Sequence, residues 1–243
     1  MSPKYPRLRT ADKVPPPYPL GKFPPNFGRE IGKRIIYILA TKSSAALEGP
    51  EWEEIFAHSI GATWKPSNIG LDDIVMGNCA WGAKTVQNSK PWTCKRVRLI
   101  SGRNSPVFSY GETISTEHPP DQVGDQVVNI WNARVESIRS KFPHVRTVVL
   151  IKGPGLLTLS VFEFETVRYN PSLYEWRWNE NGNLEGWRDG KKKFTWQPHG
   201  SQFTIIEEVP DSRLKIRVRD PGKVPQDNLL EAIGFDDSWI EVQ

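Results

Sequence analysis

Apolar residues recur at the spacing of an amphipathic helix in two segments near the start of the chain. These patterns predict helices over residues 29–41 and 50–60. Pro50 suits a first helical turn, where no amide donor is needed, and Gly61 suits a helix end. The two predicted buried stripes are Ile31, Ile35, Ile38 and Leu39, and then Trp52, Ile55, Phe56 and Ile60.

Short apolar runs separated by turn residues follow the second helix. They predict strands at residues 72–76, 80–87 and 95–101, with a Gly77-Asn78 turn closing the first two into a hairpin. A long helix then carries the stripe Val127, Val128, Trp131, Val135 and Ile138, and it ends before Phe142-Pro143. Residues 146–151 read as a buried strand. The predicted order is helix, three strands, helix, strand.

The chain divides by composition into three parts. Residues 1–28 form a proline-rich basic arm that we do not expect to pack as an element. Residues 29–152 form an α/β core, and residues 153–243 form a β-rich extension of the same domain. The strands expected in that extension are 157–169, 174–178, 193–196, 202–207 and 214–219.

Charge and cysteine usage narrow the class of protein. The net charge is +4 and the pI is about 9, a mild indication of polyanion binding. Basic residues cluster at 95–103, 191–193 and 213–219. Cys79 and Cys94 provide neither a disulfide framework nor a zinc set, so we expect a reducing, cytoplasmic compartment. The chain contains no apolar stretch near the roughly 20 residues that span a bilayer and no signal peptide, so no membrane partner is expected.

The predicted hairpin carries the residues with catalytic potential. Gly70 precedes Asp72 and Asp73 at the start of the first strand, and Lys84 lies inside the second. A hairpin brings a carboxylate and an ammonium together at one edge of a sheet. Magnesium prefers oxygen ligands, and a nearby lysine can orient water or stabilise a pentavalent phosphate. Strand alternation makes one aspartate the main ligand, and the sequence leaves open which one.

This pattern resembles the PD-(D/E)XK nuclease superfamily, which includes many type II restriction endonucleases. The resemblance covers residues 50–152 and includes the element order, the run 70–73 and the run 83–85. It implies an α/β restriction-endonuclease-like core, a mixed central sheet flanked by helices, with a β-rich C-terminal elaboration. It also implies a divalent cofactor, Mg²⁺ with Mn²⁺ as a substitute.

One acid of the family pattern is missing. Ordinary members carry an acid or glutamine two residues before the lysine, where this chain has Gly82. Relocation of this acid is known in the superfamily. Glu53 is the best substitute, because at ~100° per residue it borders the buried stripe of its helix. Glu163 and Glu165 are weaker substitutes.

Two polar loops carry candidate DNA contacts. Arg103, Asn104 and Ser105 follow the third predicted strand, and these residue types read base edges or hold phosphates. His199 and Gln202 belong to a second loop. A surface turn is an equally good interpretation of the first loop. Trp176 and Trp178 could stack on flipped bases, but core packing is the commoner use of tryptophan.

The resemblance therefore predicts a sequence-specific, magnesium-dependent DNA endonuclease of restriction type. It implies double-stranded DNA as substrate, a homodimer, and a cognate DNA methyltransferase in the same system. Gly82 keeps open an alternative, a catalytically inactive DNA- or RNA-binding module of the same fold. A third interpretation, a β-rich protein-interaction domain, predicts no salt-sensitive DNA binding.

Overall fold

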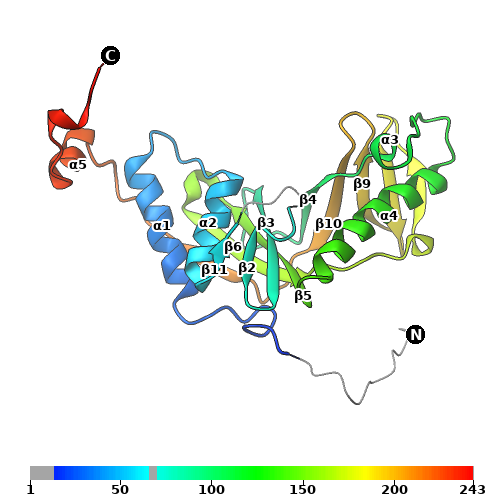
Figure 1. Ribbon diagram of the computed structural model, residues 1–243, viewed down its shortest axis with the longest axis horizontal. Coiled ribbons are helices and arrows are strands. Elements are labelled where there is room, and N and C mark those ends of the chain that lie inside the picture. Colours follow the sequence, from blue (N-terminus) through cyan, green and yellow to red (C-terminus); the bar gives the residue numbers. More distant parts are fainter. Residues whose placement is uncertain (1–13, 66–69, 243) are drawn as a thin grey trace.

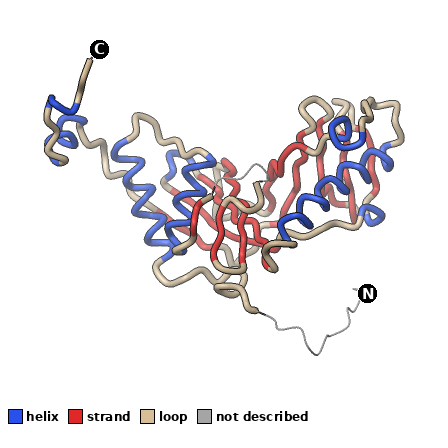
Figure 2. The backbone as a smooth tube through the Cα atoms, in the orientation of Figure 1, coloured by secondary structure: helices blue, strands red, loops and turns tan. Residues whose placement is uncertain are grey.

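The computed structural model describes residues 14–65 and 70–242, which form a mixed α/β structure built on two sheets (Figures 1 and 2). The first sheet has the strand order β1-β2-β3-β5-β6-β11, and the second has the order β4-β10-β9-β8-β7. The first half of the chain contributes α1 (Phe27–Thr41), α2 (Gly49–Ile60), β1 (Thr63–Trp64), β2 (Ile74–Met76), β3 (Cys79–Gln87), β4 (Arg96–Arg103), α3 (Pro106–Tyr110) and α4 (Pro120–Arg139). The second half contributes β5 (His144–Lys152), β6 (Thr158–Glu165), β7 (Glu175–Trp178), β8 (Leu184–Arg188), β9 (Lys191–Gln197), β10 (Gln202–Glu208), β11 (Leu214–Arg217) and α5 (Gln226–Ala232).

The two early helices form as their apolar stripes predict. α1 and α2 bury the predicted residues against one face of the first sheet, together with Trp81 and Ala83 of β3. A capping box between Glu48 and Glu51 starts α2, and Gly61 ends it with a positive φ of 73°. Local sequence and tertiary packing therefore agree in this part of the fold.

The opposite face of the first sheet packs against the second sheet and α4. Val149, Ile151 and Phe162 contact Val97 and Leu99 of β4. The stripe of α4 joins a separate core with the inner side chains of β7 to β10, among them the buried Trp176. Figure 1 shows α1 and α2 at one end of the molecule and α3 and α4 at the other. The core use of Trp176 is thus confirmed.

Two sequence expectations are corrected by the structure. The hairpin's first strand begins at Ile74, so both aspartates lie in the loop before it. The third predicted strand, β4, forms and pairs with β10 in the second sheet, while β5 lies parallel to β3 in the first. The described part of the N-terminal arm packs, and Tyr18 is buried. Residues 1–13 lie outside the described range.

Short elements without a long apolar period were not predicted. They are β1, α3, β8 and α5. Among the described residues, none of the helices combines the length and the apolar character needed to cross a bilayer.

Candidate active site

The hairpin of β2 and β3 positions the two central candidates. Antiparallel pairing places Ile74 opposite Trp81, so Asp73 lies alongside Gly82, two residues before Lys84 on β3. The Asp73 carbonyl also accepts a hydrogen bond from the Lys65 amide at 2.7 Å, which extends the pairing of β1 with β2. The loop that carries the aspartates is therefore held against the strand that carries the lysine.

Gly82 has a steric explanation. A Cβ atom at this position would lie 2.7 Å from the Gly70 carbonyl oxygen and 3.3 Å from the Leu71 Cα. The backbone before Asp72 thus crosses directly over Gly82, which leaves no room for a side chain. The aspartate loop therefore occupies the space that an acidic side chain at position 82 would need.

Lys84, Asp73 and Glu53 share one electrostatic environment. Burial lowers the pKa of the Lys84 ammonium, and the nearby carboxylates of Asp73 and Glu53 oppose that shift. Burial also raises the pKa of Glu53, and the charge of Asp73 raises it further. Asp73 itself is only 4% exposed. The structure thus brings together one lysine and two carboxylates that are separated by up to 31 positions in the sequence.

The helix α2 supplies Glu53 from the edge of its buried stripe, as its angle predicts. The Trp64 indole donates to Glu53 Oε2 at 3.1 Å, and this bond lowers the Glu53 pKa against the effect of burial. Trp64 belongs to β1, the strand beside β2. A side chain of the hairpin's own sheet therefore orients the glutamate.

The two adjacent aspartates differ in their surroundings. Asp73 is buried and affects the pKa values of both Glu53 and Lys84, whereas Asp72 is half-buried. Because both aspartates precede the strand, the alternation of side chains along a strand does not assign them to opposite faces. The position of Asp73 on the loop, alongside Gly82, favours it as the aspartate that joins Glu53 and Lys84.

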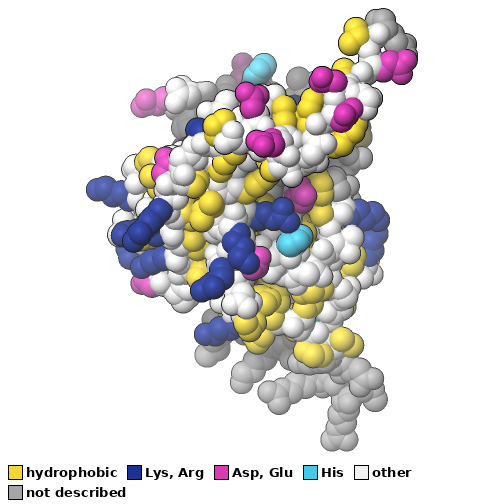
Figure 3. Space-filling model, turned by 90° about the vertical axis from the view of Figure 1, so that its left-hand side faces the viewer, with side chains coloured by type: hydrophobic (Ala, Val, Ile, Leu, Met, Phe, Trp, Pro, Cys, Tyr) yellow, Lys and Arg dark blue, Asp and Glu magenta, His cyan; other side chains and the backbone are white. Residues whose placement is uncertain are grey.

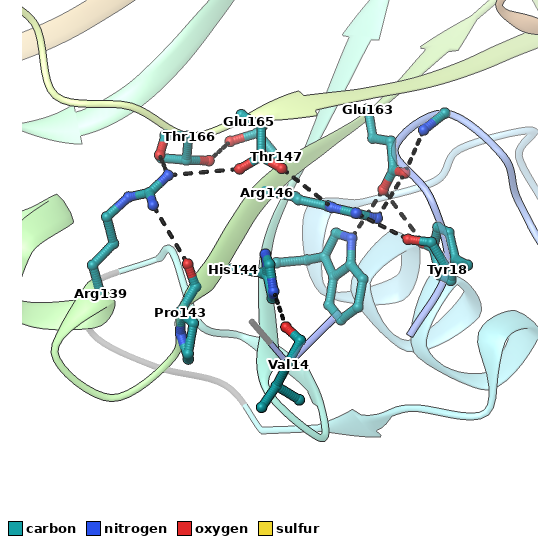
Figure 4. A network of polar contacts seen from close by, with 12 residues as sticks. Val14, Tyr18, Arg139, Pro143, His144, Arg146, Thr147, Glu163, Glu165 and Thr166 are labelled. Atoms are coloured by element: carbon teal, nitrogen blue, oxygen red, sulfur yellow. Dashed lines mark hydrogen bonds and ion pairs between the residues drawn. The ribbon is translucent and has the colours of Figure 1, made fainter. Parts of the chain in front are cut away.

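Glu163 and Glu165 serve a different network, shown in Figure 4. Glu163 pairs with the buried Arg146 at 3.1 Å and accepts hydrogen bonds from the Trp81 indole and the Tyr18 hydroxyl. Glu165 lies 3.7 Å from Arg146. Glu163 shares a face of the sheet with Trp81, while Lys84 is one residue out of phase with that face. Neither Glu163 nor Glu165 therefore lies on the face of the sheet that carries Lys84.

The donor chemistry fits a hard divalent cation. Asp73 and Glu53 offer carboxylate oxygens as ligands. The two carboxylates repel each other, which raises the Glu53 pKa, and a cation bound between them would relieve this repulsion. Across residues 14–65 and 70–242, no group of three or more His, Cys, Asp or Glu side chains is placed to hold a metal. Magnesium usually keeps several waters, so two carboxylates are a sufficient protein contribution.

Sequence reasoning missed Arg134. This α4 residue lowers the Lys84 pKa, and its guanidinium donates to the Ser101 carbonyl at 2.7 Å and to Asn104 Oδ1 at 3.1 Å. The sequence does contain a signal that could have identified this residue, because Arg134 borders the apolar stripe formed by Trp131 and Val135. A cation at the edge of a buried stripe contacts the next layer of structure.

The two predicted DNA-contact loops lie side by side. Gln202 of β10 pairs with Arg103 of β4, and the Asn104 amide donates to the Ser201 carbonyl at 2.8 Å. Arg103 and His199 are exposed. Ser105 caps α3 by accepting from the Phe108 amide at 3.3 Å.

Asn104 is a correction to the predicted set. Its side chain is fully buried, and its amide donates to the Val127 carbonyl of α4 at 2.8 Å. Its backbone carbonyl accepts from the Trp196 indole at 2.8 Å. Asn104 therefore joins α4 to the second sheet, and its base-reading groups are already used.

Comparisons with protein-family models, with curated proteins and with solved structures found no match to this chain.

Proposed function

We propose that this chain is a divalent-metal-dependent DNA endonuclease of restriction type. The observation that carries the proposal is the convergence of Asp73, Glu53 and Lys84, in which both carboxylates act on the lysine pKa. A cluster of two acids and one lysine has the chemical groups needed for phosphodiester hydrolysis. Perturbed pKa values in one place are typical of functional sites.

Each residue has a defined role in this proposal. Asp73 and Glu53 would hold Mg²⁺, which when bound neutralises developing charge on the phosphate and activates water. Lys84 positions the attacking water and stabilises the phosphorane oxygens with its ammonium. Trp64 keeps the Glu53 carboxylate in place through its indole hydrogen bond. Asp72 has no catalytic role in this scheme.

The substrate and partners follow from charge and resemblance. The basic balance of the chain and the exposed Arg103 beside Gln202 support duplex DNA as substrate. Resemblance alone supports a cytoplasmic homodimer with a cognate DNA methyltransferase.

Cleavage of plasmid DNA with and without Mg²⁺ tests the proposal. We expect cutting only with Mg²⁺ or Mn²⁺, and mapped ends give the cut position. Lys84→Ala should lower cleavage by at least about a hundredfold, as removal of a transition-state donor does, with DNA affinity nearly unchanged in fluorescence anisotropy. Lys33→Ala, at an exposed lysine that pairs with Glu30 on the surface, is the matched control and should cut normally. Full cleavage by Lys84→Ala would refute the catalytic role.

A second candidate, a catalytically inactive DNA- or RNA-binding module, is favoured by the two-carboxylate donor set and by Gly82. Calorimetric titration with Mn²⁺ separates the candidates. The endonuclease should bind the ion and lose this binding in Asp73→Ala but retain it in Asp72→Ala. DNA binding without any metal binding would support the inactive module.

A further inference from the structure

The short helix α3 exposes a group of aromatic and apolar side chains to solvent. Phe108 is 92% exposed, and Val107 and Tyr110 are also largely exposed. The helix is nevertheless fixed, because Pro106 is buried, Ser105 caps its start and Gly111 ends it with a positive φ. Neighbouring exposed apolar and aromatic side chains on a fixed backbone are typical of a binding surface.

A groove lies beside these exposed side chains, between α3, α4 and the β9–β10 loop. Its volume is about 880 Å³, within the usual range for sites that bind small molecules. Its walls combine aromatic, apolar and hydroxyl side chains with two arginines, and none of the described residues lining it is acidic. Residues that define it include Arg103, Phe108, Tyr110, Ile130, Arg134 and Ser201.

One residue, Arg134, links the groove electrostatically to the candidate active site. Arg134 lines the groove from α4, its guanidinium donates to the Ser101 carbonyl of β4, and its charge lowers the pKa of Lys84. Arg103, at the other wall, is exposed and lies at the end of β4. A ligand in the groove would therefore have anionic groups near Arg103 and an aromatic part near Phe108.

We propose that this groove binds an unstacked nucleobase of the DNA strand that enters the active site, with Phe108 as its stacking platform. Arg103 contacts the flanking phosphate, and the hydroxyl groups of Ser105 and Ser201 offer hydrogen bonds to the base or backbone. Aromatic stacking with cationic flanks is the chemistry that holds single bases. The inference rests on the proposed function, since it assigns a substrate contact to the same site.

Single-stranded oligothymidylate and an abasic deoxyribose phosphate oligomer of equal length test this proposal. Fluorescence anisotropy at fixed salt gives the affinity for each. Wild-type protein should bind oligothymidylate about tenfold more tightly, the effect of stacking one base. Phe108→Ala should remove most of this preference without changing the affinity for the abasic oligomer. Because Phe108 is exposed, this variant should fold normally.

Two further variants make the result specific. Arg103→Ala should weaken binding to both oligomers by a similar factor, because it contacts phosphate. Tyr37→Ala removes another exposed aromatic residue, which lies on α1, and should keep the preference for bases. Equal binding of both oligomers by wild type, or a preference that survives Phe108→Ala or is also lost in Tyr37→Ala, would overturn the proposal.

The outcome is separable from that of the proposed function. Lys84→Ala should retain the preference for oligothymidylate while losing plasmid cleavage. Metal-dependent cutting without base preference refutes the groove alone. Base preference in a protein that never cuts supports the groove and refutes the endonuclease.

Discussion

At the scale of single residues, Gly82 shows how backbone geometry decides which acids reach a site. A side chain there would displace the Gly70 carbonyl, and with it the loop that delivers Asp73. The glutamate on α2 approaches from a different element and needs no space on β3. The site therefore gains its second carboxylate where the steric restriction does not apply.

The crowding at Gly82 leads to a prediction about stability. Gly82→Ala should lower the free energy of unfolding by about 2 kcal/mol, the usual effect of overpacking a tight site, and should reduce cleavage by shifting Asp73. Gly49→Ala is the control, since a Cβ at that first residue of α2 has nothing within 4 Å. It should be neutral or slightly stabilising. Urea denaturation measures both, and a fully stable Gly82→Ala would show that the loop can move.

A half-buried carboxylate away from the site gives a pH-dependent prediction. Burial raises the pKa of Glu207, and Lys193 only partly opposes this. A raised folded-state pKa means that the native state is relatively more stable below the unfolded pKa and loses that stability as pH rises through the folded value. Glu207→Gln should therefore stabilise the protein at neutral pH. The gain should vanish below about pH 4, and a gain that persists in acid would contradict the argument.

At the scale of elements, α4 is held against the second sheet by a close approach of backbone to an aromatic ring. The Trp176 ring lies over Gly124 so closely that a Cβ there would be 2.2 Å from it. Gly186 of β8 approaches the same ring, with a Cβ distance of 2.8 Å. The ring also stacks on Phe194 at 5.8 Å. Two glycines thus provide the space in which Trp176 is buried.

Helix propensity and packing make opposite predictions at Gly124. In an isolated helix, alanine would be about 1 kcal/mol better than glycine. Here we expect Gly124→Ala to destabilise the protein by about 2–3 kcal/mol, because it forces the ring away. Combining it with Trp176→Leu should recover part of the loss in a double-mutant cycle measured by urea denaturation. Strict additivity would show that the ring is not the cause.

The N-terminal segment behaves as a part of the fold. The Tyr18 carbonyl accepts from Arg146 at 2.9 Å, and the Gly21 amide donates to Glu163 at 2.8 Å. The Val14 carbonyl accepts hydrogen bonds from Asn78 and His144. The Tyr18 and Gly21 contacts add hydrogen bonds to the buried Arg146–Glu163 pair, which would otherwise be more costly. The segment therefore completes a polar network inside the sheet.

At the scale of the whole molecule, charge is divided unevenly. Residues 225–242 contain five acidic residues and no lysine or arginine, although the chain as a whole is basic. α5 has no buried residue, and Figure 1 shows it standing away from the body. In Figure 3, which views the molecule from the α5 end, acidic side chains gather in the upper part and basic side chains lie mostly below them.

Removal of the acidic segment gives a prediction at this scale. A chain ending at Val224 keeps the hydrogen bond from its amide to the Ala40 carbonyl. Its free energy of unfolding should change by less than about 0.5 kcal/mol, because the segment buries no side chain. Its affinity for DNA should rise at low salt, with the difference shrinking as salt screens the charges. Anisotropy titrations over a salt series test this, and unchanged affinity at low salt would refute it.

The sequence alone determined the features that depend on local periodicity. The apolar stripes of α1 and α2, the turn at Gly77-Asn78 and the alternation in β11 are all present in the structure, because each depends on neighbours a few residues away. Lys84 emerged as a candidate from its place in the predicted hairpin, and Glu53 from the resemblance together with its helical angle.

Tertiary structure decided the rest. Only packing shows that the loop before β2 covers Gly82, that Asp73 acts on Lys84, and that Asn104 is buried. Placement of β4 in the second sheet joins the two predicted DNA loops and creates the groove beside Phe108. These features come from contacts between residues far apart in the chain, and no local pattern of polar and apolar positions encodes such distances.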